Sequence, residues 1–256
     1  MNILHCIYDH PSNPWVGGGG AVRAYEVLKR LAAKGHEITI LSGRYPGAKD
    51  YSEGRLRYIF TGSDKNYLLS TFSFAFNAAK YIKANSSGFD VVVEDFAPWN
   101  PVFSFVLSKS PTVLHVNHRE GFNIIKRWPL IGLPFYIIET IYPKFFRHVT
   151  ALSEWTREKI GMPEALVLPA GIDEKLLENI TPNFRDGGFV YYVGRLHIKN
   201  KGLDTLINAI KLLGGAKLVV AGRGKDEKKL KEMSKRLNVE FLGFVDEQKK
   251  IELMKR

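Results

Sequence analysis

Short apolar runs alternate with amphipathic segments along the first 170 residues. The runs are typical of buried β-strands and lie at 2–8, 37–42, 55–60, 89–95, 111–117, 148–153 and 165–169. Between them, residues 21–35 and 66–84 repeat apolar side chains at helical spacing and predict helices. Strands that alternate with helices predict a mostly parallel, twisted sheet with helices on both faces.

The first predicted helix has an apolar stripe and a clear stop. Gly35 lies where the chain leaves the helix, a place that favours a residue tolerating positive φ. The apolar side chains that recur at helical spacing are Val22, Tyr25, Leu28, Leu31 and Ala32.

The pattern restarts after residue 187, with a loop-like stretch before it. The new series predicts strands at 189–195, 216–222 and 239–244, with helices over 202–214, 226–237 and from 246 onward. We therefore expect two Rossmann-like, doubly wound α/β domains, 1–170 and 188–256, joined by a linker over 171–187. Three strands are fewer than the about five or six of a typical doubly wound sheet, so we expect the C-terminal domain to be incomplete.

Charge and composition narrow the choice of partners and compartment. The net charge of +11 favours a polyanionic partner, such as a phosphorylated small molecule or an anionic lipid. Zinc-binding spacing, a helix–turn–helix and aromatic RNA-binding signatures are missing, so we expect no nucleic-acid partner. The single cysteine, Cys6, excludes a disulfide framework and indicates a reducing compartment. With no signal peptide and no apolar run of about 20 residues visible, we expect a cytoplasmic protein.

Four consecutive glycines, Gly17–Gly20, stand between the first strand and the first helix. In open α/β sheets, ligands bind beyond the carboxyl ends of the strands, where helix N-termini offer free N–H donors. Glycines at such a place keep side chains out of a ligand site and permit positive φ. A flexible turn is the alternative. A dinucleotide fingerprint fits poorly, because Val22 stands where its third glycine belongs and the second strand lacks the expected acidic residue.

Six stretches together carry a resemblance to a known family. They are GGGGAVR (17–23), ALSEWTREKI (151–160), LPAGID (168–173), YVGRLHIKNKGLDTLINAI (192–210), LVVAGRGKDEKKLKE (218–232) and VEFLGFVDEQKKIELMKR (239–256). They resemble family 4 of the retaining glycosyltransferases, which have the two-domain GT-B fold. The resemblance implies transfer of a sugar from a UDP- or GDP-linked donor to a glycan or lipid-linked acceptor, with retention of configuration. It implies no cofactor and no obligatory metal.

The same resemblance gives the glycines a role. It implies that Gly18, Gly19 and Gly20 approach the donor diphosphate and the acceptor in a cleft between the two domains. A side chain at these positions would enter that cleft.

The stretch GRLHIKNKG places two cations after a buried strand. Arg195 follows the strand directly, and Lys201 stands just before a helix start. A guanidinium fork and an ammonium group suit a diphosphate and stabilise it as it leaves. The resemblance implies this catalytic and diphosphate-binding role for both residues. Lys199 is a close neighbour of Lys201, and two solvated surface cations are the alternative.

The strand at 111–117 brings two histidines near the expected acceptor site. Members of the family usually place a histidine at the end of this strand, facing the transferred sugar, and here His115 and His118 compete. We predict His118 as the catalytic histidine, because it lies at the carboxyl end of the strand, where it is free to bond a sugar hydroxyl. A structural histidine is the alternative.

The strand at 89–95 ends in two carboxylates, Glu94 and Asp95, and Trp99 follows shortly after. Carboxylates beside an aromatic ring suit hydroxyl recognition and ring stacking, so we predict that these three residues bind the acceptor. The resemblance places them on the acceptor side, so we do not interpret the carboxylates as an acid/base pair. Local turn chemistry is the alternative.

Residues 122–148 mix aromatic and basic side chains to an unusual degree for a connector. The aromatic residues are Phe122, Trp128, Phe135, Tyr136, Tyr142 and Phe145, and the basic ones are Lys126, Arg127, Lys144 and Arg147. This mixture suits a helix at the interface of an anionic membrane. We predict peripheral contact with the inner face of the cell membrane; core helices that cover the sheet are the alternative.

One departure from the family bears on activity. Members continue past a stretch like 239–256 into a Glu-x7-Glu motif, whose glutamates contact the donor sugar and the ribose. The sequence stops at Arg256 before that motif, so we expect a truncated donor domain. A catalytically inactive nucleotide-sugar or glycan-binding remnant is therefore the main alternative. A Rossmann oxidoreductase and a purely peripheral membrane partner are weaker ones.

Overall fold

The computed structural model of the chain describes residues 1–172 and 188–255. The chain divides into two compact units between Gly171 and Ile172, next to the predicted domain boundary at residue 170. The predicted linker, 171–187, falls almost entirely outside the described residues and stays a prediction. Each unit has its own sheet and its own core.

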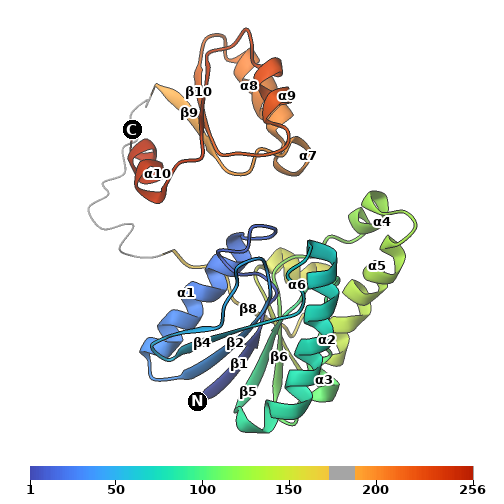
Figure 1. Ribbon diagram of the computed structural model, residues 1–256. Helices are drawn as coiled ribbons and strands as arrows, with labels where there is room; N and C mark the ends of the chain where they lie inside the picture. The colour runs from blue at the N-terminus through green and yellow to red at the C-terminus, as the bar shows by residue number, and fades with distance from the viewer. Residues whose placement is uncertain (173–187, 256) are drawn as a thin grey trace. The chain divides into compact units, whose positions relative to one another are not determined.

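The described residues of the first unit form an eight-stranded sheet with the order β3-β4-β2-β1-β5-β6-β7-β8 (Figure 1). Neighbouring strands are parallel except for the pair of β3 and β4. The strands are β1 (Asn2–Cys6), β2 (Glu37–Gly43), β3 (Tyr51–Glu53), β4 (Leu56–Thr61), β5 (Val91–Asp95), β6 (Thr112–Val116), β7 (His148–Ala151) and β8 (Leu166–Val167). Each apolar run predicted as a strand forms one, so the prediction of a mostly parallel sheet is confirmed.

Two long helices, α1 (Gly19–Ala33) and α2 (Tyr67–Asn85), cover opposite faces of this sheet (Figure 1). Side chains alternate along a strand, so Ile3 joins the core that contains Leu28 of α1, whereas Leu4 joins the core that contains Phe74 of α2. The remaining helical segments are α3 (Ser104–Leu107), α4 (Asn123–Arg127), α5 (Gly132–Ile141), α6 (Glu154–Ile160) and the short 3₁₀ turns Ser86–Gly88 and Tyr142–Phe145.

Helix α1 differs from its sequence prediction at its start and in its buried face. It begins at Gly19, two residues earlier than predicted, and the chain leaves it at Gly35, whose φ is +94°. Ala21 and Ala24 are buried against the sheet, whereas Val22 is 51% exposed. Small side chains therefore take the positions nearest the strands, and Val22 lies outside the apolar stripe we predicted.

The order of the strands defines where a ligand site is expected. The chain runs from β1 outward to β2 and β4, and then returns to the other side of β1 to form β5. The carboxyl ends of β1 and β5 are therefore the topological switch point of the sheet, where open α/β sheets bind ligands. Gly17–Gly20 follow β1, and Asp95 ends β5. The fold thus brings two of the predicted site segments to one place.

The second unit has a smaller parallel sheet in its described part, with the order β11-β10-β9. Its elements are β9 (Phe189–Val193), α7 (Ile198–Lys201), α8 (Leu203–Leu212), β10 (Lys217–Ala221), α9 (Glu227–Met233), β11 (Val239–Gly243) and α10 (Glu247–Met254). Leu218 and Val220 of β10 are buried in one core with Ile207 of α8 and Leu230 of α9. Each of the three strands predicted for this domain forms one.

Candidate functional site

The four consecutive glycines divide into two groups with different reasons to be glycine. At Gly17, an added Cβ would lie 2.8 Å from the carbonyl oxygen of Asn13 and 2.9 Å from that of Pro11. The Gly17 amide also donates a hydrogen bond to the Asn13 oxygen at 2.7 Å. Gly17 is therefore required by the folding of its own loop.

Gly18, Gly19 and Gly20 are not crowded in this way. Among the described residues, an added Cβ would meet nothing closer than 3.8 Å at Gly18 or Gly20, and nothing within 4 Å at Gly19. None of Gly17–Gly20 has a positive φ, so our expectation of that conformation is wrong. Gly18 is the N-cap of α1 and supplies no side chain to cover its first amides. The start of this 15-residue helix is left open to an anionic or hydroxyl-bearing ligand.

Asp9 stands beside this helix start. Its Oδ2 lies 3.8 Å from the place a Cβ on Gly20 would occupy. Burial and the nearby negative charge of Asp95 raise the pKa of Asp9 to about 6. A carboxyl group that gives up its proton near pH 6 thus faces the switch point.

Asp95 is the most highly connected side chain in this region. Its side chain is 2% exposed. Its Oδ2 lies 2.7 Å from Nε2 of His5. The carboxylate also accepts hydrogen bonds from the Arg23 guanidinium at 2.8 and 3.0 Å and from the side-chain amide of Asn117 at 2.8 Å. Burial alone would raise the pKa of Asp95, but the His5 hydrogen bond and the Arg23 charge outweigh it and hold that pKa well below its usual range. Its oxygens are used within the protein and are not open to an acceptor.

His115 belongs to the same buried group. Its Nδ1 lies 2.7 Å from the Thr150 hydroxyl, and 4% of the residue is exposed. Burial lowers the pKa of His115 to about 4, with Arg23 adding to this effect and Asp95 opposing it. The imidazole is therefore neutral at pH 7. Its buried position fits a structural histidine, whereas His118 remains the candidate for a contact with the sugar.

Glu94 has a structural role on the other face of the sheet. It is 2% exposed and accepts hydrogen bonds from the Val102 amide, the Ser104 amide and hydroxyl, and the Tyr142 hydroxyl, at 2.6–3.2 Å. Burial raises the pKa of Glu94, although these four hydrogen bonds act in the opposite direction. A carboxylate with these four hydrogen bonds is not free to bind an acceptor, so our prediction of an acceptor contact for Glu94 is wrong. Glu94 instead holds residues 102–104 against β5.

Trp99 lies in the loop after β5 and is half-buried. Its ring packs on Phe135 of α5, with ring centroids 4.5 Å apart and planes tilted by 55°. Part of the indole is thus taken up by packing. Stacking of an acceptor on the rest of the ring stays a prediction.

His118 is exposed at the carboxyl end of β6, unlike His115. Its segment is held from both sides. Before it, Asn117 is tied to Asp95. After it, the buried carboxylate of Glu139 accepts the amides of Glu120 and Gly121 at 2.7 and 2.8 Å. His118 is therefore an accessible imidazole on a fixed backbone, which suits the predicted contact with a sugar hydroxyl.

In the second unit, two Gly-Arg loops, Gly194–Arg195 and Gly222–Arg223, follow neighbouring strands. An added Cβ on Gly222 would lie 1.9 Å from the carbonyl oxygen of Gly194, so only glycine permits this approach. The Leu196 amide also donates to the Arg223 oxygen at 3.0 Å. Both arginines are exposed, so two neighbouring loops at the carboxyl edge of this sheet each present an arginine to solvent.

Lys201 closes the short helix α7, which directly follows the first Gly-Arg loop. The helix start is fixed by Asp226, whose carboxylate accepts the Ile198 amide at 2.8 Å. Lys199 and Lys201 are both exposed. Both lysines lie in the helix that follows Arg195 in sequence, and their exposure does not distinguish between them.

Residues 122–148 form two helices and a turn, not one interfacial helix. Pro129 follows α4, and an added Cβ on Gly132 would lie 2.7 Å from the Ile124 oxygen, so α5 starts in close contact with α4. Tyr142 is 4% exposed and belongs to the core. The exposed apolar residues are Phe122, Trp128, Leu130, Ile131, Leu133, Ile137, Ile141 and Phe145. Part of the segment therefore packs into the core, and contact of its exposed part with a membrane stays a prediction.

The described residues contain neither a membrane-spanning helix nor a cluster of metal-binding side chains. None of the helices there combines the length and apolarity needed to cross a membrane. Across 1–172 and 188–255, no cluster of three or more His, Cys, Asp and Glu side chains could hold a metal ion.

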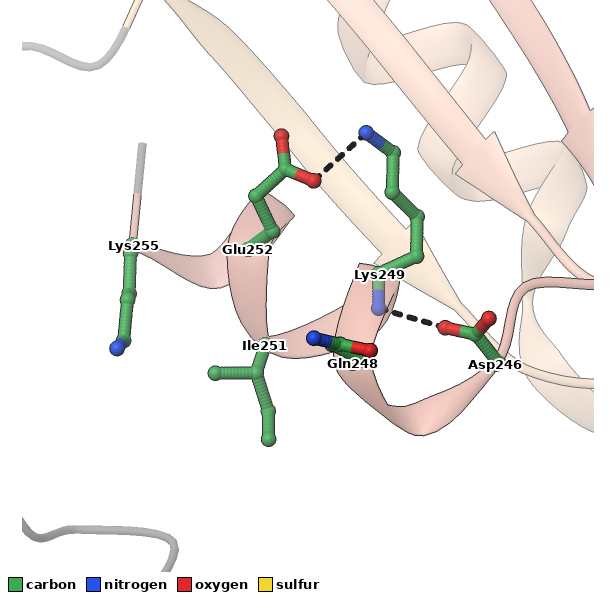
Figure 2. Close-up of a pocket in the computed structure, with 6 residues that line it drawn as sticks. All are labelled: Asp246, Gln248, Lys249, Ile251, Glu252 and Lys255. Atoms are coloured by element: carbon green, nitrogen blue, oxygen red, sulfur yellow. Dashed lines mark hydrogen bonds and ion pairs between the residues drawn. The ribbon is translucent and has the colours of Figure 1, made fainter.

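A shallow surface hollow runs along α10 (Figure 2). Figure 2 shows that Lys249 pairs with Glu252, at 2.8 Å, while the Lys249 amide donates to the Asp246 carboxylate at 2.7 Å. The six residues that line the hollow all come from this one helix and its cap. Lys249, Glu252 and Asp246 bond to one another, and we assign the hollow no role.

Several solved structures are similar to this chain over nearly its whole length. Three similar ones are the lipopolysaccharide outer core galactosyltransferase WaaB (16% identity, TM-score 0.59, 98% of this chain and 70% of that one), a sucrose-phosphate synthase from Thermosynechococcus elongatus (16%, 0.73, 96% and 71%) and Anabaena HepE in complex with UDP and glucose (13%, 0.57, 100% and 72%). These similarities show the GT-B fold of glycosyltransferases, as predicted.

The family follows from the sequence models. The chain belongs to Glycosyltransferase Family 4, whose model matches residues 17–176. The model of glycosyl transferases group 1 matches residues 173–256. No curated protein matches the chain. The predicted resemblance to family 4 is thereby confirmed.

Sequence reasoning missed three residues that organise the first unit: His5, Arg23 and Asn117. Each had a signal in the sequence. His5 is a polar residue within an apolar strand, and Arg23 is the first charge after the glycines. Asn117 ends the strand that precedes His118. All three residues bond to Asp95. Which side chains meet Asp95 depends on the order and register of the strands, which the sequence does not reveal.

Proposed function

We propose that this protein transfers a sugar from a nucleoside diphosphate donor to a glycan or lipid-linked acceptor, with retention of anomeric configuration. The observation that carries the proposal is the carboxyl edge of the second sheet, where Arg195 is exposed on a glycine-fixed loop and Lys201 follows it. Family membership and the UDP in the HepE structure support a nucleotide-sugar donor, linked to UDP or GDP.

The proposed chemistry is stabilisation of a leaving diphosphate. As the bond between the sugar and the phosphate breaks, negative charge grows on the diphosphate oxygens. The Arg195 fork and the Lys201 ammonium offset that charge, and they need no proton transfer to do so. Gly18, Gly19 and Gly20 leave the start of α1 open for the diphosphate or the acceptor, and the exposed His118 bonds a hydroxyl of the transferred sugar. This scheme uses no cofactor and no metal.

Of Glu94, Asp95 and Trp99, which we predicted to bind the acceptor, only Trp99 remains a candidate. Trp99 retains an uncovered part of its ring for stacking. Glu94 and Asp95 are buried and act on the protein itself.

The proposal is tested by turnover of a panel of UDP- and GDP-linked sugars, with release of UDP or GDP as the readout. We expect release from at least one donor, increased by a glycan or lipid-linked acceptor and lost in Arg195→Ala and Lys201→Ala. NMR of the product should give the anomeric configuration of the donor. Inversion contradicts the retaining mechanism, and release that persists in both variants contradicts the site.

A binding remnant without catalysis is the second candidate. Tight binding of UDP or GDP without turnover of any donor would support it.

We further propose a cytoplasmic protein that rests on the inner face of the cell membrane through residues 122–148. Exposed apolar side chains from this segment lie beside exposed Lys126, Arg127, Lys144 and Arg147. Apolar groups that enter the interface and cations that meet anionic headgroups act together in peripheral binding. A lipid-linked acceptor would be reached from that surface.

A further inference from the structure

Asp95 is a buried carboxylate that the proposed chemistry does not use. Its side chain is 2% exposed and takes hydrogen bonds or ion pairs from three different segments. Burying an ion pair costs desolvation, and well-packed apolar residues often serve stability as well or better. The charge at this position therefore points to a need for defined geometry.

The three partners of Asp95 all belong to segments of the candidate site. His5 lies in β1, which leads into the glycines. Arg23 lies in the second turn of α1, whose open start is formed by Gly18–Gly20. Asn117 directly precedes His118. One carboxylate thus links the first helix, through Arg23, to the residue before His118.

Glu94 provides an internal comparison. It is the preceding residue of β5 and also has a buried carboxylate, but its side chain points to the opposite face. Its donors are Val102, Ser104 and Tyr142, which carry no predicted substrate contact. A structural carboxylate and an organising carboxylate therefore stand side by side in one strand.

We propose that Asp95 is a positioning residue, which holds Arg23 and Asn117 so that the open start of α1 and His118 face one substrate at the switch point. The inference rests on the proposed function, because it takes these two segments to be the ones that contact substrate. Asp95 itself touches neither donor nor acceptor. It acts through the residues that it orients.

Amide hydrogen exchange of the full chain tests the positioning role without any substrate. In Asp95→Asn, we expect two sets of hydrogen-bonded amides to exchange about tenfold faster or more: amides 22–25 of α1, and the Leu152 amide, which donates to the Val116 carbonyl just before Asn117. Amides in 102–106 should keep their protection. The amides of Glu120 and Gly121 should also stay protected, because Glu139 holds them independently. In the control variant Glu94→Gln, the pattern should reverse. Equal loosening of the same peptides in both variants overturns the proposal.

Asn117→Ala is a second variant that leaves the Asp95–Arg23 ion pair in place. It should speed exchange of the Leu152 amide and leave amides 22–25 unchanged, and it keeps the test valid if Asp95→Asn does not fold. Faster exchange in neither segment overturns the proposal.

Steady-state kinetics distinguish a positioning role from a purely structural one, because only the first should change kcat without a similar change in the donor KM. In Asp95→Asn we expect kcat to fall about 10- to 100-fold through misplacement of the sugar and acceptor contacts. The donor KM should change less than about threefold, because Arg195 and Lys201 belong to the other unit. A fall in kcat of the same size in Glu94→Gln contradicts the proposal. Absence of transfer in the wild-type protein counts against the proposed function alone, since the exchange pattern is independent of it.

Discussion

Glu94 and Asp95 are neighbours in β5, and their carboxylates serve opposite faces of one sheet. The alternation follows from the pleat: Val91 and Val93 pack on the α1 side, as Asp95 does, whereas Val92 packs on the α2 side with Glu94. This division was readable from the period of two in the sequence. The burial of both groups was not, because it depends on helices that pack over them.

At the same scale, His115 should make stability depend on pH. Its pKa in the folded protein is lowered to about 4, whereas the unfolded chain takes up the proton near pH 6.5. The unfolded state therefore binds more protons between these values, and the free energy of unfolding falls as the pH drops from 6.5 to 4. The full effect of this histidine is on the order of 3 kcal/mol.

Asp9 acts in the opposite direction and must be separated from His115. Its pKa is raised to about 6, so the folded state takes up this proton first and gains stability as the pH falls toward 4. Urea denaturation of His115→Gln and wild type at pH 7 and pH 4.5 isolates the histidine, with the exposed His148→Gln as control. We expect the wild type to lose more stability than His115→Gln by roughly 2 kcal/mol. Parallel losses contradict the assignment.

At the scale of elements, α1 illustrates what periodicity predicts and what it omits. The sequence predicted the helix and its stop at Gly35, but placed its start after the glycines. Gly19 and Gly20 have low helix propensity, yet Gly18 caps the helix and both join its first turn. The short strand β3 was missed because Tyr51–Glu53 is exposed, polar in part and at the edge of the sheet.

The two kinds of glycine before α1 predict opposite effects of the same substitution. Gly19→Val should change the free energy of unfolding by less than about 1 kcal/mol, because its Cβ meets no described atom within 4 Å. Donor turnover should nevertheless be lost, because the branched side chain fills the ligand space. Gly17→Val should destabilise by about 1–3 kcal/mol through contact with the Asn13 and Pro11 oxygens. Denaturation and turnover assays check both. Full turnover in Gly19→Val would favour a simple flexible turn.

The exposed apolar and basic side chains of residues 122–148 predict salt-sensitive membrane binding. At low salt the protein should co-sediment with anionic liposomes, and it should be released as ionic strength rises, since charges are screened over about 10 Å at 0.1 M. Replacing Lys126, Arg127, Lys144 and Arg147 with Gln should remove most of the binding.

A control variant separates the position of the charges from their number. Changing the exposed Lys211, Lys228, Lys229 and Lys235 to Gln removes the same charge from the second unit. This control should still bind anionic liposomes. If both variants lose the same amount of liposome binding, or if the wild type sediments equally with neutral vesicles, residues 122–148 are not a membrane-binding surface.

At the scale of the whole molecule, the two-unit organisation followed from the restart of the strand pattern near residue 188. The site did not follow in the same way. Asp95 joins residues 5, 23 and 117, which lie far apart in the sequence and meet only because β1, β5 and β6 are adjacent. Strand order and register depend on packing across the whole sheet. In the second unit, by contrast, Arg195 and Lys201 are close in sequence and were predicted directly.

The two units should differ in stability. The described part of the second unit has three strands, and Val190, Val193 and Phe244 are exposed there. We expect amides in 188–255 to exchange faster than those in 2–120, and the chain to self-associate as concentration rises. Hydrogen exchange and light scattering measure both. Equal protection of the two units in a monomeric protein would contradict this expectation.

We infer that the Gly-Arg edge of the second unit binds a nucleoside diphosphate. Calorimetric titration of the full chain with UDP and with GDP measures this binding. Arg195→Ala should weaken binding by about 1–3 kcal/mol, or roughly 5- to 150-fold, as expected for a lost charge-assisted hydrogen bond. The control Arg236→Ala removes an exposed arginine that precedes β11, at the opposite end of the strands, and should leave affinity unchanged. Binding of neither nucleotide by the wild type, or equal affinity in wild type and Arg195→Ala, would contradict the claim.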